Sequence, residues 1–187
     1  MANKKISDLT DAGTSASTDY YEVEQASGSR KQSRAAMRTA MAPSYAKISD
    51  TKTQNTNGGT ATSGTWEVRD LQTEDQDPDS IVSISSNRFT LQAGTYYIKA
   101  KAPGYSVDTH RIKLYNYTDT SDVIIGDNSQ SAGSAQTNAE LEGKFTISSA
   151  KEFEIRHRVV TTYATIGHGI ASNFTTEVYT VVEIWKL

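Results

Sequence analysis

The sequence predicts an all-β protein, an antiparallel sandwich or barrel preceded by an amino-terminal segment of different character. Of the 187 residues, 45 are Ser or Thr and ten are Tyr, which is typical of β-rich chains. From Ser44 onward, short runs of alternating polar and apolar residues are separated by turn-rich stretches. Neither a lasting heptad pattern nor an internal repeat is present, so no fibrous shaft is expected.

Two runs show a period of two most clearly. In 140–147, Leu141, Phe145 and Ile147 share one face, and polar or charged residues occupy the other. In 151–160, apolar residues and His157 alternate with Glu and Arg. The short link between these runs predicts a hairpin. The other expected strands are 45–53, 65–71, 80–84 with 89–91, 95–102, 109–117 and 122–125.

The last run, Glu177–Leu187, is apolar on both faces. The expected faces are Val178, Val182 and Ile184 on one side, and Tyr179, Val181, Trp185 and Leu187 on the other. In a sandwich only one face of a strand meets the core, so the second face needs another cover. We predict that Tyr179, Val181, Trp185 and Leu187 contact sister copies of the chain. The alternative is a central strand overlaid by the tail or by a long loop.

Residues 1–43 form a separate predicted unit, with six basic and five acidic residues against thirteen and seventeen in 44–187. A short strand is expected over 19–25 and a turn over 26–28. Ser29 with Gln32 fits a capping box that opens a helix to about Met41, and Pro43 ends it. Its basic residues are Arg30, Lys31, Arg34 and Arg38. They form either a docking element for an acidic surface on a larger assembly or a solvated linker face.

Composition excludes several function classes. The formal charge of −3 argues against a nucleic-acid binder, and the absence of Cys excludes disulfide scaffolds, thiolate metal sites and a cysteine nucleophile. Residues 1–13 lack an apolar signal-peptide core and no run of about eighteen apolar residues occurs, so we expect no membrane partner. The usual motifs of hydrolases, nucleotide-binding proteins and zinc enzymes are also absent. We therefore expect neither an enzyme nor a bound cofactor.

Two polar patterns resemble metal or acid–base sites. Asp75, Asp77 and Asp79 take the first, third and fifth positions of a calcium loop, but Ser80 and Ser86 replace its essential glycine and glutamate. An acidic surface turn without a metal is the better interpretation. His157 lies on the inward face of its strand, where we expect a hydrogen-bonded core histidine.

Paired carboxylates are the one enzymatic pattern that remains. Glu140 with Glu142, and Glu152 with Glu154, lie about 6.6 Å apart by strand rise, near the lower limit for an inverting glycosidase. Neighbouring Lys and Arg residues favour a charge ladder on a wet face instead. A glycan-degrading enzyme is kept as an alternative function.

Three segments of the body form a familiar pattern: Leu91–Ile98 (LQAGTYYI), His110–Asn116 (HRIKLYN) and Glu177–Leu187. They resemble segments in the jelly-roll heads of the tumour-necrosis-factor and complement globular-head superfamily, particularly versions in bacteriophage structural proteins. Lys5–Gly13 (KISDLTDAG), followed by Asp19–Gln25 and Ser29–Lys31, is similar to the attachment segment of many phage fibre proteins. Together the two regions cover nearly the whole chain.

The resemblance implies a homotrimer in which the carboxy-terminal strand lines the threefold contact. It also implies a virion protein, assembled in the bacterial host cytoplasm, whose amino-terminal segment docks on other virion proteins. Without a shaft, a short head fibre, capsid decoration or stubby tail appendage is expected. If a host-surface glycan is a partner, shallow contacts are expected from loop groups such as Tyr105, Asn116 and Tyr117. A lectin-like or cytokine-like module unrelated to viruses is the other alternative.

Overall fold

The computed structural model describes residues 20–23, 30–33 and 42–187, and the chain divides into units of residues 1–42 and 43–187. In the first unit, strand β1 (Tyr20–Val23) pairs antiparallel with β2 (Arg30–Ser33). β1 matches the strand expected over 19–25. β2 corrects the helix expected from Ser29, because its backbone is extended and paired with β1. An extended segment also avoids placing basic residues against the positive end of a helix dipole. Arg34 and Arg38 lie outside the described residues.

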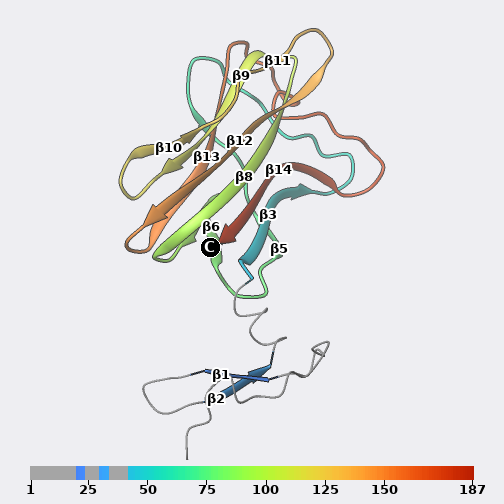
Figure 1. Cartoon of the computed structure of the whole chain (residues 1–187). Helices are drawn as coiled ribbons and strands as arrows, with labels where there is room; N and C mark the ends of the chain where they lie inside the picture. Colours follow the sequence, from blue (N-terminus) through green and yellow to red (C-terminus); the bar gives the residue numbers. More distant parts are fainter. Residues whose placement is uncertain (1–19, 24–29, 34–41) are drawn as a thin grey trace, which may run out of the picture. The chain divides into compact units, whose positions relative to one another are not determined.

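The second unit is a sandwich of two antiparallel sheets (Figure 1). The five-stranded sheet runs in the order β12 (Gln136–Ile147), β8 (Gly94–Tyr105), β14 (Glu177–Lys186), β3 (Ser44–Lys52) and β5 (Thr73–Gln76). The seven-stranded sheet has the path β10 (Ser121–Ile125), β9 (Asp108–Asn116), β13 (Lys151–Val159), β7 (Arg88–Leu91) and β6 (Val82–Ser85). Its remaining strands are β11 (Ser129–Ser131), beside β9, and β4 (Glu67–Val68), beside β13. No described residue belongs to a helix long and apolar enough to cross a membrane.

The chain passes repeatedly from one sheet to the other. β8, β12 and β14 belong to the five-stranded sheet, whereas β9 and β13 belong to the seven-stranded sheet. The predicted hairpin across 148–150 is therefore wrong, because β12 pairs with β8 whereas β13 pairs with β9, β7 and β4. The alternation predicted within each strand is correct: Leu141 on β12 and Phe153 on β13 both face the interior.

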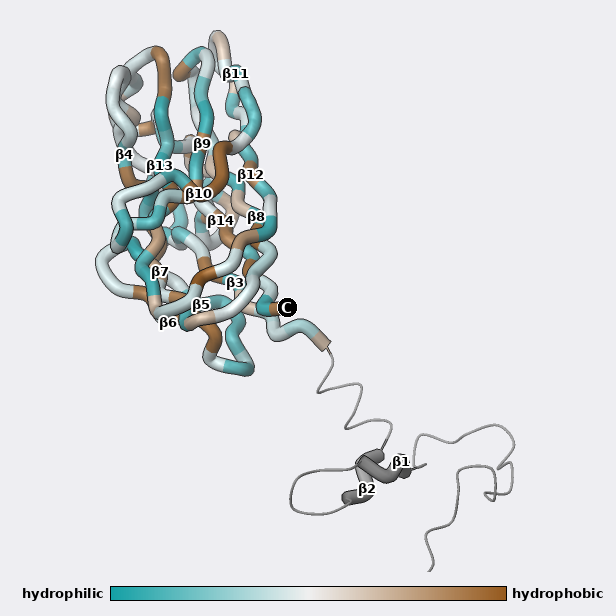
Figure 2. The backbone as a smooth tube through the Cα atoms, turned by 60° about the vertical axis from the view of Figure 1, so that its left-hand side comes forward, coloured by the Kyte–Doolittle hydropathy of each residue, from teal (hydrophilic) through white to brown (hydrophobic). Residues whose placement is uncertain are grey.

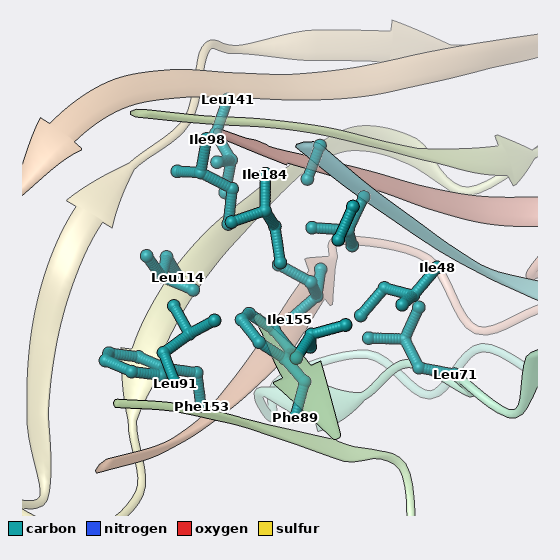
Figure 3. Close-up of a cluster of buried hydrophobic side chains, with 14 of the residues drawn as sticks. Ile48, Leu71, Phe89, Leu91, Ile98, Leu114, Leu141, Phe153, Ile155 and Ile184 are labelled. Atoms are coloured by element: carbon teal, nitrogen blue, oxygen red, sulfur yellow. The ribbon is translucent and has the colours of Figure 1, made fainter. Parts of the chain in front are cut away.

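Apolar side chains from the inner faces of both sheets meet in one continuous core (Figure 3). Four aromatic rings run through it from sheet to sheet. Phe89 stacks on Phe153 with ring centroids 5.6 Å apart, Phe153 lies 5.4 Å from Phe145, and Phe145 lies 5.8 Å from Tyr96. Hydrophilic and hydrophobic residues alternate along the strands around this core (Figure 2). The aromatic contacts hold the two sheets face to face.

One end of the core is polar and contains all three histidines of the chain. Along the inward face of β13, His157 lies between Ile155 of the main core and Val159 of a small second apolar cluster. His157 Nε2 lies 2.9 Å from Nδ1 of His110, and its ring stacks on His168. The prediction of a hydrogen-bonded core histidine is confirmed.

Arg69 is buried beside these histidines, with 1% of its surface exposed. Its Nε donates to the Thr180 hydroxyl on β14 and one terminal nitrogen donates to the carbonyl of His168, both at 2.9 Å. The backbone N–H of Arg69 donates to the carbonyl of Ile155 on β13. Arg69 therefore connects a strand of each sheet and the loop that carries His168.

The environment of this polar end keeps the histidines neutral. Burial, with a smaller effect of the Arg69 charge, lowers the pKa of His110 to about 4 and that of His168 to about 3. The pKa of His157 falls well below its usual value for the same reasons, together with the neighbouring histidines. Other charges near the cluster are Glu67, 3.4 Å from His168, and Asp50 and Asp70 around Arg69.

Acid is expected to destabilise the sandwich of residues 43–187, called the head domain from here on, before its carboxylates protonate. Below pH 6.5, His110, His157 and His168 bind protons in the unfolded chain but stay neutral in the folded chain. The free energy of unfolding therefore falls as the pH falls. Each histidine contributes up to about 1.4 kcal/mol per pH unit. Urea unfolding of 43–187 at pH 7, 6 and 5 measures the slope. His157→Gln should flatten it, and equal stability at all three values would contradict the prediction.

Shortening Phe153 should weaken the contact between the sheets. Phe153→Ala removes the ring that touches both Phe89 and Phe145, and should lower the free energy of unfolding by about 3–5 kcal/mol. Phe174→Ala is the matched control, because 88% of the Phe174 surface is exposed and its loss should change stability by less than about 0.5 kcal/mol. Similar denaturation midpoints for the two variants would show that the aromatic chain does not hold the sheets together.

Candidate subunit interface

The outward face of the five-stranded sheet is the candidate functional surface, because it presents β14 between two long strands. Apolar side chains of β14 also point inward, where Val182 and Ile184 are fully buried in the core. The outward side chains of β14 are Val181, Glu183 and Trp185, all partly exposed, and Leu187 follows with 58% of its surface exposed. The predicted two-sided apolarity is thus present in the carboxy-terminal half of the strand.

A bulge changes the first half of β14. The register with β3 shifts between Val178 and Val181, so the simple alternation expected over 177–187 breaks there. The alternation predicted that Val178 shares the core face with Val182. This is wrong, because 53% of the Val178 surface is exposed. Tyr179 is buried within its own chain, and its hydroxyl donates to the carbonyl of Thr56 at 2.7 Å. Of the four predicted contact residues, the structure places Val181 and Trp185 on the outward sheet face and Leu187 just beyond it.

An aromatic row crosses this face at Trp185. Trp185 lies opposite Tyr45 on β3 and opposite Tyr97 on β8, with ring centroids 5.2 and 5.8 Å from its own. The hydroxyl of Tyr45 donates to Glu183 at 2.9 Å, and burial together with this bond raises the pKa of Tyr45 to about 12. Neither tyrosine was predicted as part of the interface. Only the register of β3, β14 and β8 brings them beside Trp185.

The next row is a ladder of alternating charge. Glu183 lies between Lys47 and Lys99, and Lys99 lies opposite Glu142. Glu142 accepts from the hydroxyl of Tyr97 at 3.0 Å and pairs with Lys99 at 3.2 Å, which lowers the pKa of its carboxyl. Beyond this ladder, Val181 borders a hollow of about 360 Å³. The face therefore combines one aromatic row with one row of alternating charge, in which Lys47 and Lys99 are each paired with a carboxylate of the same chain.

The other candidates from the sequence have structural roles. Glu154 is buried and bridges Arg88 and Arg156 at 2.8 and 2.7 Å, so it is not paired with Glu152 for chemistry. Asp77 closes the acidic turn by accepting from the backbone N–H groups of Ile81 and Val82.

Metal-ligand geometry is also lacking in the described part of the chain. Within 20–23, 30–33 and 42–187, no group of three or more His, Asp or Glu side chains is arranged to hold a metal ion. This includes the three histidines at the polar end of the core.

Comparison with solved structures identifies the architecture. Murine APRIL aligns over 78% of this chain and 99% of its own length, with a TM-score of 0.52 and 9% identity. The globular domain of zebrafish complement 1qA covers 78% of this chain and 97% of its own, with a TM-score of 0.50 and 12% identity. No protein-family model and no curated protein sequence matches the chain. The head domain has the TNF-like and C1q-like jelly-roll fold that the sequence resemblance implied.

Proposed function

We propose that the chain is a homotrimeric binding protein whose subunits meet through the outward face of the five-stranded sheet. The observation that carries this proposal is the row of Tyr45, Trp185 and Tyr97, with Leu187 beside it, on the face opposite the core. Partly exposed aromatic groups of this kind are typical of the centre of protein interfaces. In the charged row beside them, Lys99 pairs with Glu142 and Lys47 pairs with Asp75, and Glu183 accepts a hydrogen bond from Tyr45. Each charged group of the row therefore has a partner within the chain, which lowers the cost of its burial.

The particular role we propose is that of a bacteriophage structural protein, a short fibre or capsid decoration located in the virion. Residues 1–43 would dock on other virion proteins, with Arg30, Lys31, Arg34 and Arg38 contacting an acidic surface. The support for this role is the resemblance of Lys5–Gly13 and Asp19–Gln25 to fibre attachment segments, together with the order of anchor and head. The fold is equally compatible with a non-viral cytokine-like or lectin module, which is the second candidate.

The proposed role is binding and not catalysis. A glycosidase needs a carboxylic acid whose pKa is raised so that it can donate a proton. The pKa of Glu142 is shifted in the opposite direction, and Glu154 is held between two arginines. Glu142 and Glu154, one member of each predicted carboxylate pair, are therefore engaged with cations of the chain.

The trimer should depend on Trp185. The purified chain is expected to have three times its monomer mass of 20.4 kDa by light scattering and native mass spectrometry. Trp185→Lys places an unpaired charge in the proposed contact and should weaken assembly by about 2 kcal/mol or more. Ile125→Lys is the matched control, because Ile125 is an exposed apolar side chain on the other sheet. A monomeric wild-type chain, or a Trp185→Lys variant that is still trimeric, would contradict the proposed interface.

Docking on the virion should depend on the basic residues of the amino-terminal segment. Replacing Arg30, Lys31, Arg34 and Arg38 together by Glu should reduce incorporation into virions about tenfold or more, because like charges then face the acidic partner surface. Quantitative immunoblots of purified particles measure incorporation. The variant should keep the mass of the wild-type assembly. Wild-type chain that is absent from particles would favour the non-viral candidate.

A further inference from the structure

A second surface feature lies on the outward face of the seven-stranded sheet, where a hollow of about 310 Å³ is lined by Trp66, Arg111, Asn128 and Arg158. Arg158 on β13 and Arg111 on β9 are directly opposite each other. Trp66 directly precedes β4, which pairs with β13, and Asn128 directly precedes β11, which pairs with β9. One row across the sheet therefore brings these four side chains to the same hollow.

The two arginines break the charge pattern of the sheet. Cations directly opposite each other on neighbouring strands repel, and two successive cross-strand pairs here are cationic. The Arg156–Lys113 pair is neutralised, because Arg156 pairs with Glu154 at 2.7 Å and Lys113 pairs with Asp122 at 2.6 Å.

The Arg158–Arg111 pair has no such compensation. Among the described residues, no carboxylate forms an ion pair with either arginine. Arg111 donates to the amide oxygen of Asn128, which carries no charge. Two adjacent guanidinium groups of this kind are suited to an external anion, and a carboxylate fits their planar donor groups.

The rest of the hollow suits a sugar ring. Trp66 is half-buried, and Nζ of Lys113 lies 4.4 Å from its ring centroid, which fixes the indole at the wall. An aromatic wall packs against the apolar face of a pyranose, and the exposed amide of Asn128 and hydroxyl of Thr109 can bond to its hydroxyl groups. We propose that this hollow binds an acidic carbohydrate, with Arg111 and Arg158 holding a sugar carboxylate and Trp66 packing on the ring.

Other polyanions fit the hollow less well. Residues 44–187 carry a net charge of −4, and a nucleic-acid strand would need many more cations to neutralise its phosphates. An extended acidic peptide gains most of its affinity by pairing with an exposed strand edge. β9 and β13 are paired on both sides in the sheet, so they offer no edge beneath the hollow.

This inference deepens the proposed binding function by naming its ligand class. It does not depend on the trimer, because one chain contributes every group of the hollow. In a trimer, three copies would raise the affinity for a repeating polymer through multivalency.

Binding can be tested with oligogalacturonate, whose sugar units each carry a carboxylate, by calorimetry and by NMR of the tryptophan indole signals. Its methyl ester is the matched ligand control, since it keeps the same sugar units and lacks the carboxylate charge. The wild-type chain should bind the acid form, more weakly at high salt. Arg111→Gln and Arg158→Gln should each weaken binding about tenfold, the usual loss for one charged hydrogen bond. Lys151→Gln, the same charge change at the other end of β13, should leave it unchanged.

Three outcomes would overturn the proposal: no binding of the acid form, equal binding of its methyl ester, or undiminished binding by the doubly substituted Arg111→Gln, Arg158→Gln variant. Tighter binding of single-stranded DNA or of a polyglutamate peptide would also overturn it, in favour of that other class. Circular dichroism of each variant controls for folding. A trimer that does not bind refutes this inference alone, whereas a monomer that binds refutes only the trimer.

Discussion

The aromatic contacts between the two sheets are the interaction on which the rest of the structure depends. Phe89 and Phe153 from one sheet meet Phe145 and Tyr96 from the other, so both inner faces are satisfied by a single apolar layer. Each sheet is then left with an outward face that the core does not need. The two outward faces differ: one carries an aromatic row around Trp185, and the other carries cations. The proposed self-assembly and ligand binding therefore use opposite sides of one core.

The polar end of the core limits how the remaining loops can be arranged. The Arg69 guanidinium donates to β14 and to the loop of His168, and the backbone N–H of Arg69 donates to β13. A buried guanidinium is costly unless it has hydrogen-bond partners of this kind. Apolar packing alone accepts many similar arrangements, whereas a hydrogen-bonded arginine accepts few. The histidines complete this environment only while they are neutral, so order at this end of the domain is coupled to pH.

Much of the fold could be predicted because alternation is a local property. The inward faces of 140–147 and 151–159 follow from their sequences. Alternation is the same, however, whether the next strand pairs with the last one or crosses to the other sheet. The expected hairpin was wrong for this reason. The position of Tyr179 depends on a bulge in β14, and no residue of this segment indicates a bulge from the sequence. Tyr45 and Tyr97 could not be assigned to the Trp185 row, nor Arg111 to Arg158, because cross-strand register joins residues far apart in the chain.

The strand register also gives the head domain a direction. Lys186 pairs with Ser44, so the chain enters and leaves the sandwich at one end. β8 runs away from that end, since Lys186 also pairs with Tyr96, and β9 begins where β8 finishes (Figure 1). Arg111 is near the start of β9 and therefore lies toward the opposite end. The point where the chain enters the sandwich and the hollow of Arg111 and Arg158 are thus separated by the length of a strand. Evolution or an engineer could remodel the distal loops to change what is captured, while the entry point stays untouched.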